Sequence, residues 1–91
     1  MVNFSLENKI ALITGASRGI GEAIALTLAE YGAHCILVSR KLDSLKAVKD
    51  KIEQKGGQAE ALACHTGNLN QIKDLFEKVK TNFGRLDILI N

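Results

Sequence analysis

The sequence contains no proline and no tryptophan, and only four aromatic residues, three Phe and one Tyr, among its 91 positions. Because proline is typical of turns and irregular loops, its absence indicates a chain that consists mostly of helices and strands. So few aromatic rings argue against a platform on which nucleic-acid bases could stack. The 12 Lys and Arg residues are interleaved with 10 Asp and Glu residues, which gives a net charge of +2. Without a basic stripe, we expect no nucleic-acid partner.

Long hydrophobic runs are also missing. No apolar run approaches the roughly 18 residues of a membrane span, so we expect no membrane partner. Residues 1–9 reach charged positions without the apolar core of a secretory signal peptide, which predicts a cytoplasmic protein. The length suffices for one small domain with a modest core, and no linker or repeat divides the chain.

Cysteine is scarce, and Cys35 and Cys64 are the two candidates for a disulfide. Two cysteines in a chain without an export signal are more often free core thiols. In the fold predicted below, they fall at opposite ends of neighbouring parallel strands, more than ~10 Å apart at ~3.3 Å per residue. A disulfide tolerates about 7 Å between its Cα atoms, so we expect both thiols to be free.

Apolar runs alternate with helical patterns along the whole chain. The sequence predicts strands at residues 10–13, 35–38, 59–64 and 86–90, and helices at residues 20–31, 42–52 and 69–83. The first two strands are continuous apolar runs, which is typical of strands buried on both faces of a parallel sheet. This β-α-β-α-β-α-β order predicts an α/β fold, a Rossmann-like doubly wound parallel sheet with helices on both faces.

The helical periodicity also predicts which side chains form the core. In the first helix the apolar positions are 20, 24, 28 and 31, and in the third they are 69, 72, 76, 79 and 83. Asn68 precedes the third helix as its expected N-cap. The predicted core residues of the three helices are Ile24, Leu28, Leu45, Val48, Ile52, Ile72, Phe76 and Val79.

The segment with the clearest chemistry is Thr14-Gly15-Ala16-Ser17-Arg18-Gly19-Ile20-Gly21, between the first strand and the first helix. Glycines here allow a tight turn, a close approach of backbone to a pyrophosphate and close helix–sheet packing. The free N–H groups at the start of the following helix can then receive phosphates. A P-loop is excluded because no Gly-Lys-Ser/Thr ends the motif. The alternative is a tight glycine turn without a ligand.

The pattern Thr14-Gly15-x-x-x-Gly19-x-Gly21 resembles the cofactor fingerprint of the short-chain dehydrogenase/reductase family. Residues 6–9 are similar to the family's Leu-x-Gly-Lys lead-in, with Asn8 in place of the Gly at a turn where Asn tolerates a left-handed backbone. Residues 83–91 resemble the family's fourth strand, which runs into an Asn-Asn-Ala-Gly motif. The resemblance implies that this chain is the cofactor-binding N-terminal part of one Rossmann domain, residues 1–91.

The family's catalytic Asn, Ser and Tyr-x-x-x-Lys have no counterpart in this sequence. Tyr31 is the only tyrosine, and no Lys lies four residues after it. We therefore name no catalytic residue and no metal ligand, and we expect no turnover from these 91 residues alone.

The residues after the second strand distinguish NADP from NAD. An acid there would accept a hydrogen bond from the ribose 2′-hydroxyl and repel a 2′-phosphate. This sequence has Ser39, Arg40 and Lys41 instead, and Arg18 falls in the same region of the family pattern. A planar guanidinium suits bidentate contact with phosphate, so we expect NADP rather than NAD.

The remaining contacts come from the resemblance. It places Ser17 and the Ile20 N–H at the ribose and pyrophosphate, His65-Thr66 where the family has an Asp-Val pair beside adenine, and Asn91 at the ribose. The alternative for His65 is a loop side chain that faces solvent. The full set of expected cofactor-binding residues is Gly15, Ser17, Arg18, Gly19, Ile20, Gly21, Ser39, Arg40, His65, Thr66 and Asn91.

Two functions remain open. In the first, the chain is part of an NADP-dependent oxidoreductase that passes hydride between the cofactor and a small carbonyl or alcohol substrate, and that forms a homo-oligomer at full length. In the second, it is a dinucleotide-binding module without turnover. The second function would leave residues 86–90 as an uncovered apolar strand, which favours the first.

Overall fold

The computed structural model describes residues 4–91. Residues 1–3, the start of the segment in which we expect no signal peptide, lie outside the described residues. Seven elements follow one another in the predicted order. The strands are β1 (Ile10–Thr14), β2 (His34–Ser39), β3 (Gln58–Ala63) and β4 (Ile88–Ile90), and the helices are α1 (Gly19–Glu30), α2 (Leu42–Gln54) and α3 (Leu69–Phe83).

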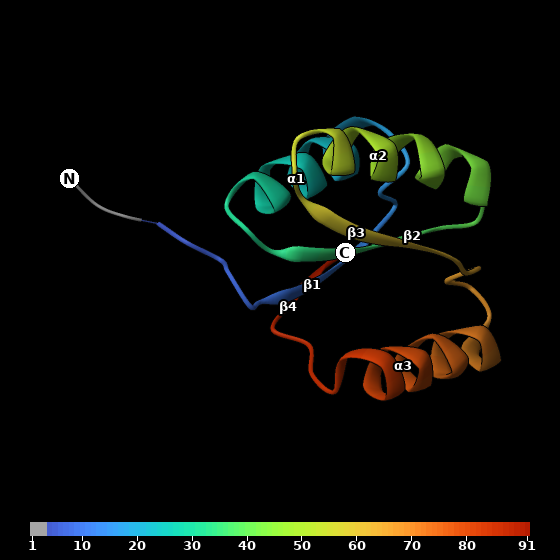
Figure 1. Ribbon diagram of the computed structural model, residues 1–91. Helices are drawn as coiled ribbons and strands as arrows, with labels where there is room; N and C mark the ends of the chain where they lie inside the picture. Colours follow the sequence, from blue (N-terminus) through green and yellow to red (C-terminus); the bar gives the residue numbers. More distant parts are fainter. Residues whose placement is uncertain (1–3) are drawn as a thin grey trace.

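The four strands form one parallel sheet in the order β3-β2-β1-β4. Helices α1 and α2 cover one face of this sheet and α3 covers the other (Figure 1). This arrangement confirms the predicted Rossmann-like α/β fold. Because all strands run in the same direction, the loops that leave β1, β2 and β3 gather at one edge of the sheet, where α/β proteins bind ligands.

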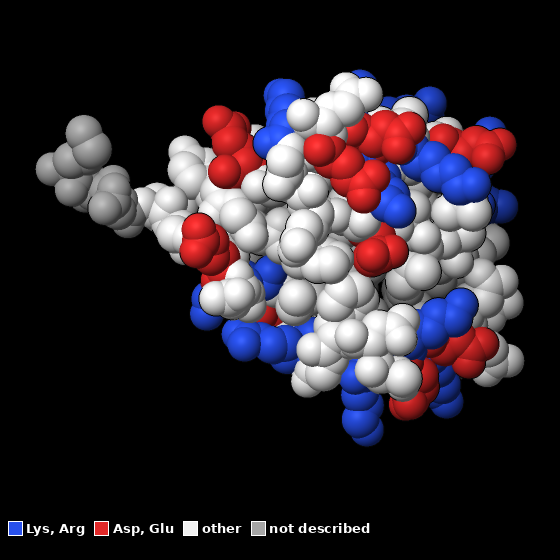
Figure 2. Space-filling view, viewed as in Figure 1, with Lys and Arg blue, Asp and Glu red and all other residues white. Residues whose placement is uncertain are grey.

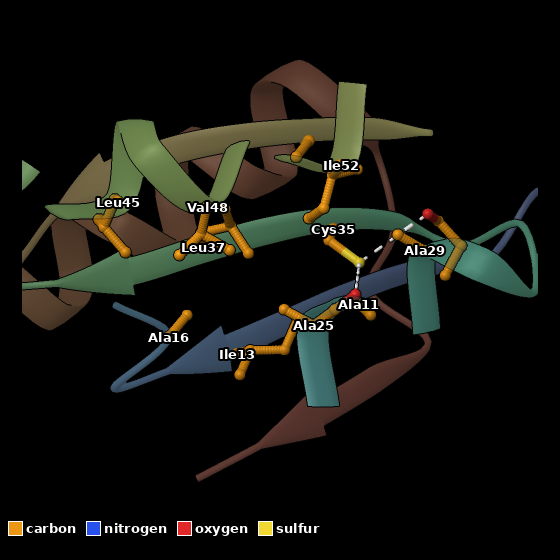
Figure 3. Close-up of a cluster of buried hydrophobic side chains, with 12 residues drawn as sticks. Ala11, Ile13, Ala16, Ala25, Ala29, Cys35, Leu37, Leu45, Val48 and Ile52 are labelled. Carbon is orange, nitrogen blue, oxygen red and sulfur yellow. Dashed lines mark hydrogen bonds between the residues drawn. The ribbon is translucent and has the colours of Figure 1, made fainter. Parts of the chain in front are cut away.

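Strands β1 and β2 are buried on both faces, which explains their continuous apolar sequences. Alternate side chains enter two separate core clusters. The cluster beneath α1 and α2 (Figure 3) contains Ala11, Ile13, Ala16, Ala25, Ala29, Ala33, Cys35, Leu37, Leu45, Val48, Ile52 and Ala59. The cluster beneath α3 contains Leu12, Ile36, Val38, Cys64, Leu75 and Val79.

The predicted core of α2 is correct, since Leu45, Val48 and Ile52 are all buried. In α1, however, the buried residues are Ala25 and Ala29 rather than the neighbouring larger residues of the predicted stripe. Ile24 and Leu28 are only half-buried, and Ile20 is 80% exposed. Alanines on the inner face let α1 approach the sheet closely, and the period of 3.6 cannot distinguish two adjacent apolar faces.

Helix α3 differs from the prediction in the same way. Val79 is buried as expected and Ile72 is half-buried, but Leu75 takes the place that we predicted for Phe76. Phe76 is 40% exposed and Leu69 is 67% exposed. The Asn68 cap is confirmed, because its side-chain oxygen accepts a hydrogen bond from the Gln71 N–H at 3.1 Å.

Strand β4 begins at Ile88, two residues later than predicted. The Asp87 N–H donates to the Ile10 carbonyl at 2.9 Å, and the Ile10 N–H donates to the Asp87 carboxylate at 2.8 Å. Arg85 holds the same carboxylate through two hydrogen bonds of 2.7 and 3.0 Å. Asp87 therefore bonds to the start of β1 through both its backbone N–H and its side chain, directly before β4.

We expect Asp87→Asn to destabilise the protein at pH 7, and this loss of stability to shrink as the pH falls below the usual range of an Asp carboxyl. The Arg85 hydrogen bond, followed by the Ile10 N–H, lowers the pKa of Asp87 in the folded state. A carboxylate with a depressed folded pKa stabilises the protein above its unfolded pKa of about 3.9, and this contribution is lost as the pH falls through the folded value. Urea unfolding of both proteins at pH 7 and pH 3 measures the difference. Asp74→Asn, at an exposed position of α3, is the control. A stability difference between Asp87→Asn and wild type that is as large at pH 3 as at pH 7 would contradict the prediction.

Cys35 and Cys64 are both free and buried, in agreement with the sequence prediction. Cys35 lies opposite Ala59 near the start of β3, whereas Cys64 directly follows the end of that strand. Burial raises the pKa of the Cys35 thiol to about 11. Its sulfur lies 3.6 Å from the carbonyl oxygen of Ala25 in the core beneath α1 (Figure 3). Cys35 is therefore a packing residue of low reactivity.

No helix within residues 4–91 is both long enough and apolar enough to cross a membrane. In the same range, no group of three or more His, Cys, Asp and Glu side chains could hold a metal ion. On the face shown in Figure 2, acidic and basic side chains are interleaved.

Candidate functional site

The turn between β1 and α1 has the backbone geometry that its glycines make possible. Gly15 and Gly19 have φ angles of +63° and +62°, in the left-handed region that favours glycine. Gly21 is required for lack of space rather than for its φ angle, because a Cβ there would lie 2.2 Å from the carbonyl oxygen of Gly15. The Ala16 N–H donates to the Val38 carbonyl at 3.2 Å, which ties the turn to the end of β2.

Helix α1 starts from this turn with its first N–H groups uncapped by a side chain. Its N-cap, Arg18, has an extended backbone with φ −164° and makes no side-chain capping bond. The first four N–H groups of a helix have no partner within the helix, and together with the helix dipole they attract anions. Ile20, exposed in the first turn, contributes one of these groups.

A cleft of about 530 Å³ lies beside the turn, at the carboxyl edge of the sheet. It is lined by residues of the β1–α1 turn, the β2–α2 connection and the β3–α3 loop: Gly15, Ser17, Arg18, Ser39, Arg40, Lys41, Ser44, Cys64 and Thr66. Six of the eleven residues expected from the sequence are therefore brought together here: Gly15, Ser17, Arg18, Ser39, Arg40 and Thr66.

The other five expected residues do not line the cleft. Gly19, Ile20 and Gly21 form the start of α1 next to it. His65 lies between two lining residues, but its ring is folded over the loop. Asn91 follows β4, where the Thr14 hydroxyl lies 3.3 Å from its side-chain oxygen.

The charge of the cleft is positive. Arg18, Arg40 and Lys41 line it, and no acidic side chain is among the lining residues. The two ion pairs found within residues 4–91 involve other cations, Lys51 and Arg85. The three cleft cations are thus exposed and available to an anionic ligand.

Three lining residues were absent from the expected set: Lys41, Ser44 and Cys64. Lys41 is the N-cap of α2, and its N–H donates to the Ser39 hydroxyl oxygen at 3.2 Å. Ser44 lies in the first turn of α2. The signal that could have found them is the fold itself, because a helix that follows a parallel strand begins at the carboxyl edge of the sheet.

Comparison with known proteins identifies the family. The model of the short chain dehydrogenase family matches residues 9–91. The chain belongs to this family. Among its relatives, a fatty acyl-CoA reductase of Acinetobacter baylyi is 44% identical over 87 residues, which cover 96% of this chain and 30% of that protein. A 3-oxoacyl-[acyl-carrier-protein] reductase of Staphylococcus epidermidis is 39% identical over 85 residues, 92% of this chain and 35% of that protein.

Solved structures of short-chain dehydrogenases have the same fold. A metagenomic short-chain oxidoreductase in complex with NADP is 40% identical, with a TM-score of 0.91 over 92% of this chain and 38% of that one. A 7α-hydroxysteroid dehydrogenase complexed with NADH is 38% identical, with a TM-score of 0.92 over 98% of this chain and 35% of that one. The chain thus spans about a third of the length of the relatives that it matches.

This short-chain dehydrogenase chain has a second hollow of similar size, about 540 Å³, at the opposite edge of the sheet. It is lined by the last turns of α1 and α2 and by the loops that follow them, including Gly32 and Gly57. The carboxyl ends of two helices carry partial negative charge, which disfavours phosphate. The cleft at the carboxyl edge, where the cations and the amino-terminal end of α1 lie, is therefore the candidate functional site.

Proposed function

We propose that residues 1–91 are the cofactor-binding part of an NADP-dependent oxidoreductase that acts on a carbonyl or alcohol substrate. The observation that carries the proposal is the cleft itself, in which Arg18 and Arg40 lie together without an acidic residue. Family membership and the NADP complex of one relative support it. A relative with NADH makes NAD the alternative.

The residues fit a dinucleotide in two respects. A Cβ at Gly21 would occupy the space that lets α1 begin close to the turn, and the first turn of α1 offers uncapped N–H groups to a pyrophosphate. Arg18 and Arg40 would hold a 2′-phosphate through charge-assisted hydrogen bonds. A carboxylate in the cleft would repel that phosphate, and none lines it.

In the proposed mechanism, this chain binds and orients the cofactor. When bound, NADP(H) supplies the hydride chemistry. The Gly15–Gly21 turn would hold the pyrophosphate together with the Ile20 N–H, and Ser17 and Asn91 would contact ribose. Ser39 would approach the 2′-phosphate beside Arg40, and Thr66 would lie beside the adenine. We assign no proton-transfer step to these residues.

The substrate is proposed only as a class. The relatives named above act on acyl and steroid compounds, according to their names. A carbonyl or alcohol group is the chemistry that these names share. A cytoplasmic location and a homo-oligomeric assembly stay predictions.

The test is a calorimetric titration, with NADPH and with NADH, of the protein that contains residues 1–91. We expect NADPH to bind at least about tenfold more tightly, because one charge-assisted hydrogen bond contributes roughly 1.5–3 kcal/mol. Raising the salt concentration should reduce this preference, since the cations of the cleft are exposed. Equal affinities would contradict the assignment to NADP, and binding of neither would contradict the proposed function.

A further inference from the structure

The loop between β3 and α3 closes one side of the cleft. Cys64 and Thr66 line the cleft, whereas His65, the residue between them, does not. Cys64 is buried and its N–H donates to the Ser39 carbonyl at 2.9 Å, so this end of the loop is tied to β2. The direction in which Thr66 points thus depends on what fixes the loop after Cys64.

His65 makes most of the bonds that fix this loop. Its N–H donates to the side-chain oxygen of Gln71 in α3 at 2.7 Å. Its carbonyl accepts from the Asn68 N–H at 2.9 Å. Its ring nitrogen Nδ1 accepts from the Gly67 N–H at 3.0 Å. The backbone and ring of one residue therefore connect β3, the loop and the first turn of α3.

The ring lies directly over Gly67. A Cβ at Gly67 would be 2.8 Å from Cε1 of His65 and 3.2 Å from its Nδ1. An acceptor at residue i that receives the N–H of residue i+2 reproduces the turn that Asn and Asp side chains make. Because Nδ1 is the acceptor, the neutral ring carries its proton on Nε2.

We propose that His65 is a positioning residue that locks the β3–α3 loop through Gly67 and Gln71, so that Thr66 faces the part of the cleft where the adenine would lie. The role of Thr66 rests on the proposed function, whereas the fixing of the loop by His65, which we call the lock, does not. This differs from the sequence expectation, in which the His65 ring contacted adenine directly.

Two substitutions separate the lock from a direct contact. His65→Asn keeps a side-chain acceptor for the Gly67 N–H, and His65→Phe keeps a ring of similar size without one. In the protein that contains residues 1–91, we expect the Gly67 amide to exchange with solvent about fivefold faster in the Phe variant, because one hydrogen bond that protects it is lost. In the Asn variant the rate should stay within about twofold of wild type.

The second readout is the affinity for NADPH. We expect His65→Phe and Thr66→Val each to weaken it about fivefold, through the loss of one hydrogen bond, and His65→Asn to preserve it. Gln71→Leu should resemble His65→Phe, because it removes the acceptor for the His65 N–H. Gln54→Leu, at an exposed position at the end of α2, is the matched control and should bind as wild type does.

The outcomes distinguish the two claims. Unchanged Gly67 exchange in His65→Phe would overturn the lock. If His65→Asn loses NADPH affinity while Gly67 stays protected, the ring itself contacts the ligand and the proposal is wrong. A wild-type chain that binds neither dinucleotide contradicts the proposed function, and the exchange rates of Gly67 then still decide whether His65 holds the loop.

Discussion

Replacement of Gly21 by alanine is expected to lower the free energy of unfolding by about 3 kcal/mol or more, and the Tm by about 15 °C. The added Cβ would lie 2.2 Å from the carbonyl oxygen of Gly15, 2.9 Å from its carbonyl carbon and 3.2 Å from the Cα of Ala16. All three are backbone atoms, so no side-chain rotation can relieve the overlap. Helix α1 must move away from the turn, and its contacts through Ala25 and Ala29 weaken with it.

Gly19→Asn is the matched control for this variant. Gly19 has a φ of +62°, but nothing lies within 4 Å of the position that a Cβ would occupy. Asparagine tolerates the left-handed conformation better than other residues with a side chain, so the loss should stay near 1 kcal/mol. Thermal unfolding of both variants measures the contrast. If Gly21→Ala has the same Tm as Gly19→Asn, the β1–α1 turn can shift to accommodate the added Cβ, and the prediction is wrong.

Removal of both arginines from the cleft should change the cofactor preference. For the double variant Arg18→Ala and Arg40→Asp, we expect NADPH affinity to fall about 100-fold or more relative to NADH affinity. Two charge-assisted hydrogen bonds of roughly 1.5–3 kcal/mol each would be lost. The new carboxylate would repel a 2′-phosphate and could accept a hydrogen bond from a 2′-hydroxyl. Calorimetric titration with each dinucleotide gives the ratio.

A charge reversal outside the cleft controls for the long-range electrostatic effect of Arg40→Asp. Lys46→Asp alters the charge by the same amount as Arg40→Asp, at an exposed position of α2 outside the cleft. It should reduce both affinities slightly and leave their ratio unchanged. If the double variant loses NADPH and NADH affinity equally, Arg18 and Arg40 do not select the 2′-phosphate. The dinucleotide proposal would survive that result, but the assignment to NADP would not.

Much of the architecture followed from local patterns in the sequence. The continuous apolar runs predicted doubly buried parallel strands, because a strand covered by helices on both faces has no polar side. Asn8 was predicted at a turn that requires a left-handed backbone, and its φ is +66°. The glycine turn could be recognised because the conformations and close approaches that it needs are possible only for particular residue types.

Tertiary structure alone decided which of two neighbouring apolar faces packs against the sheet. Ala25 rather than Ile24, and Leu75 rather than Phe76, are buried, because helix–sheet distance selects side chains by size. The start of β4 depended on the bond between Asp87 and Ile10, which lie 77 residues apart. Likewise, whether His65 faces the cleft or its own loop depended on Gly67 and Gln71. Periodicity and motif spacing describe a chain locally, whereas these outcomes depend on which distant groups fill the same space or satisfy the same hydrogen bond.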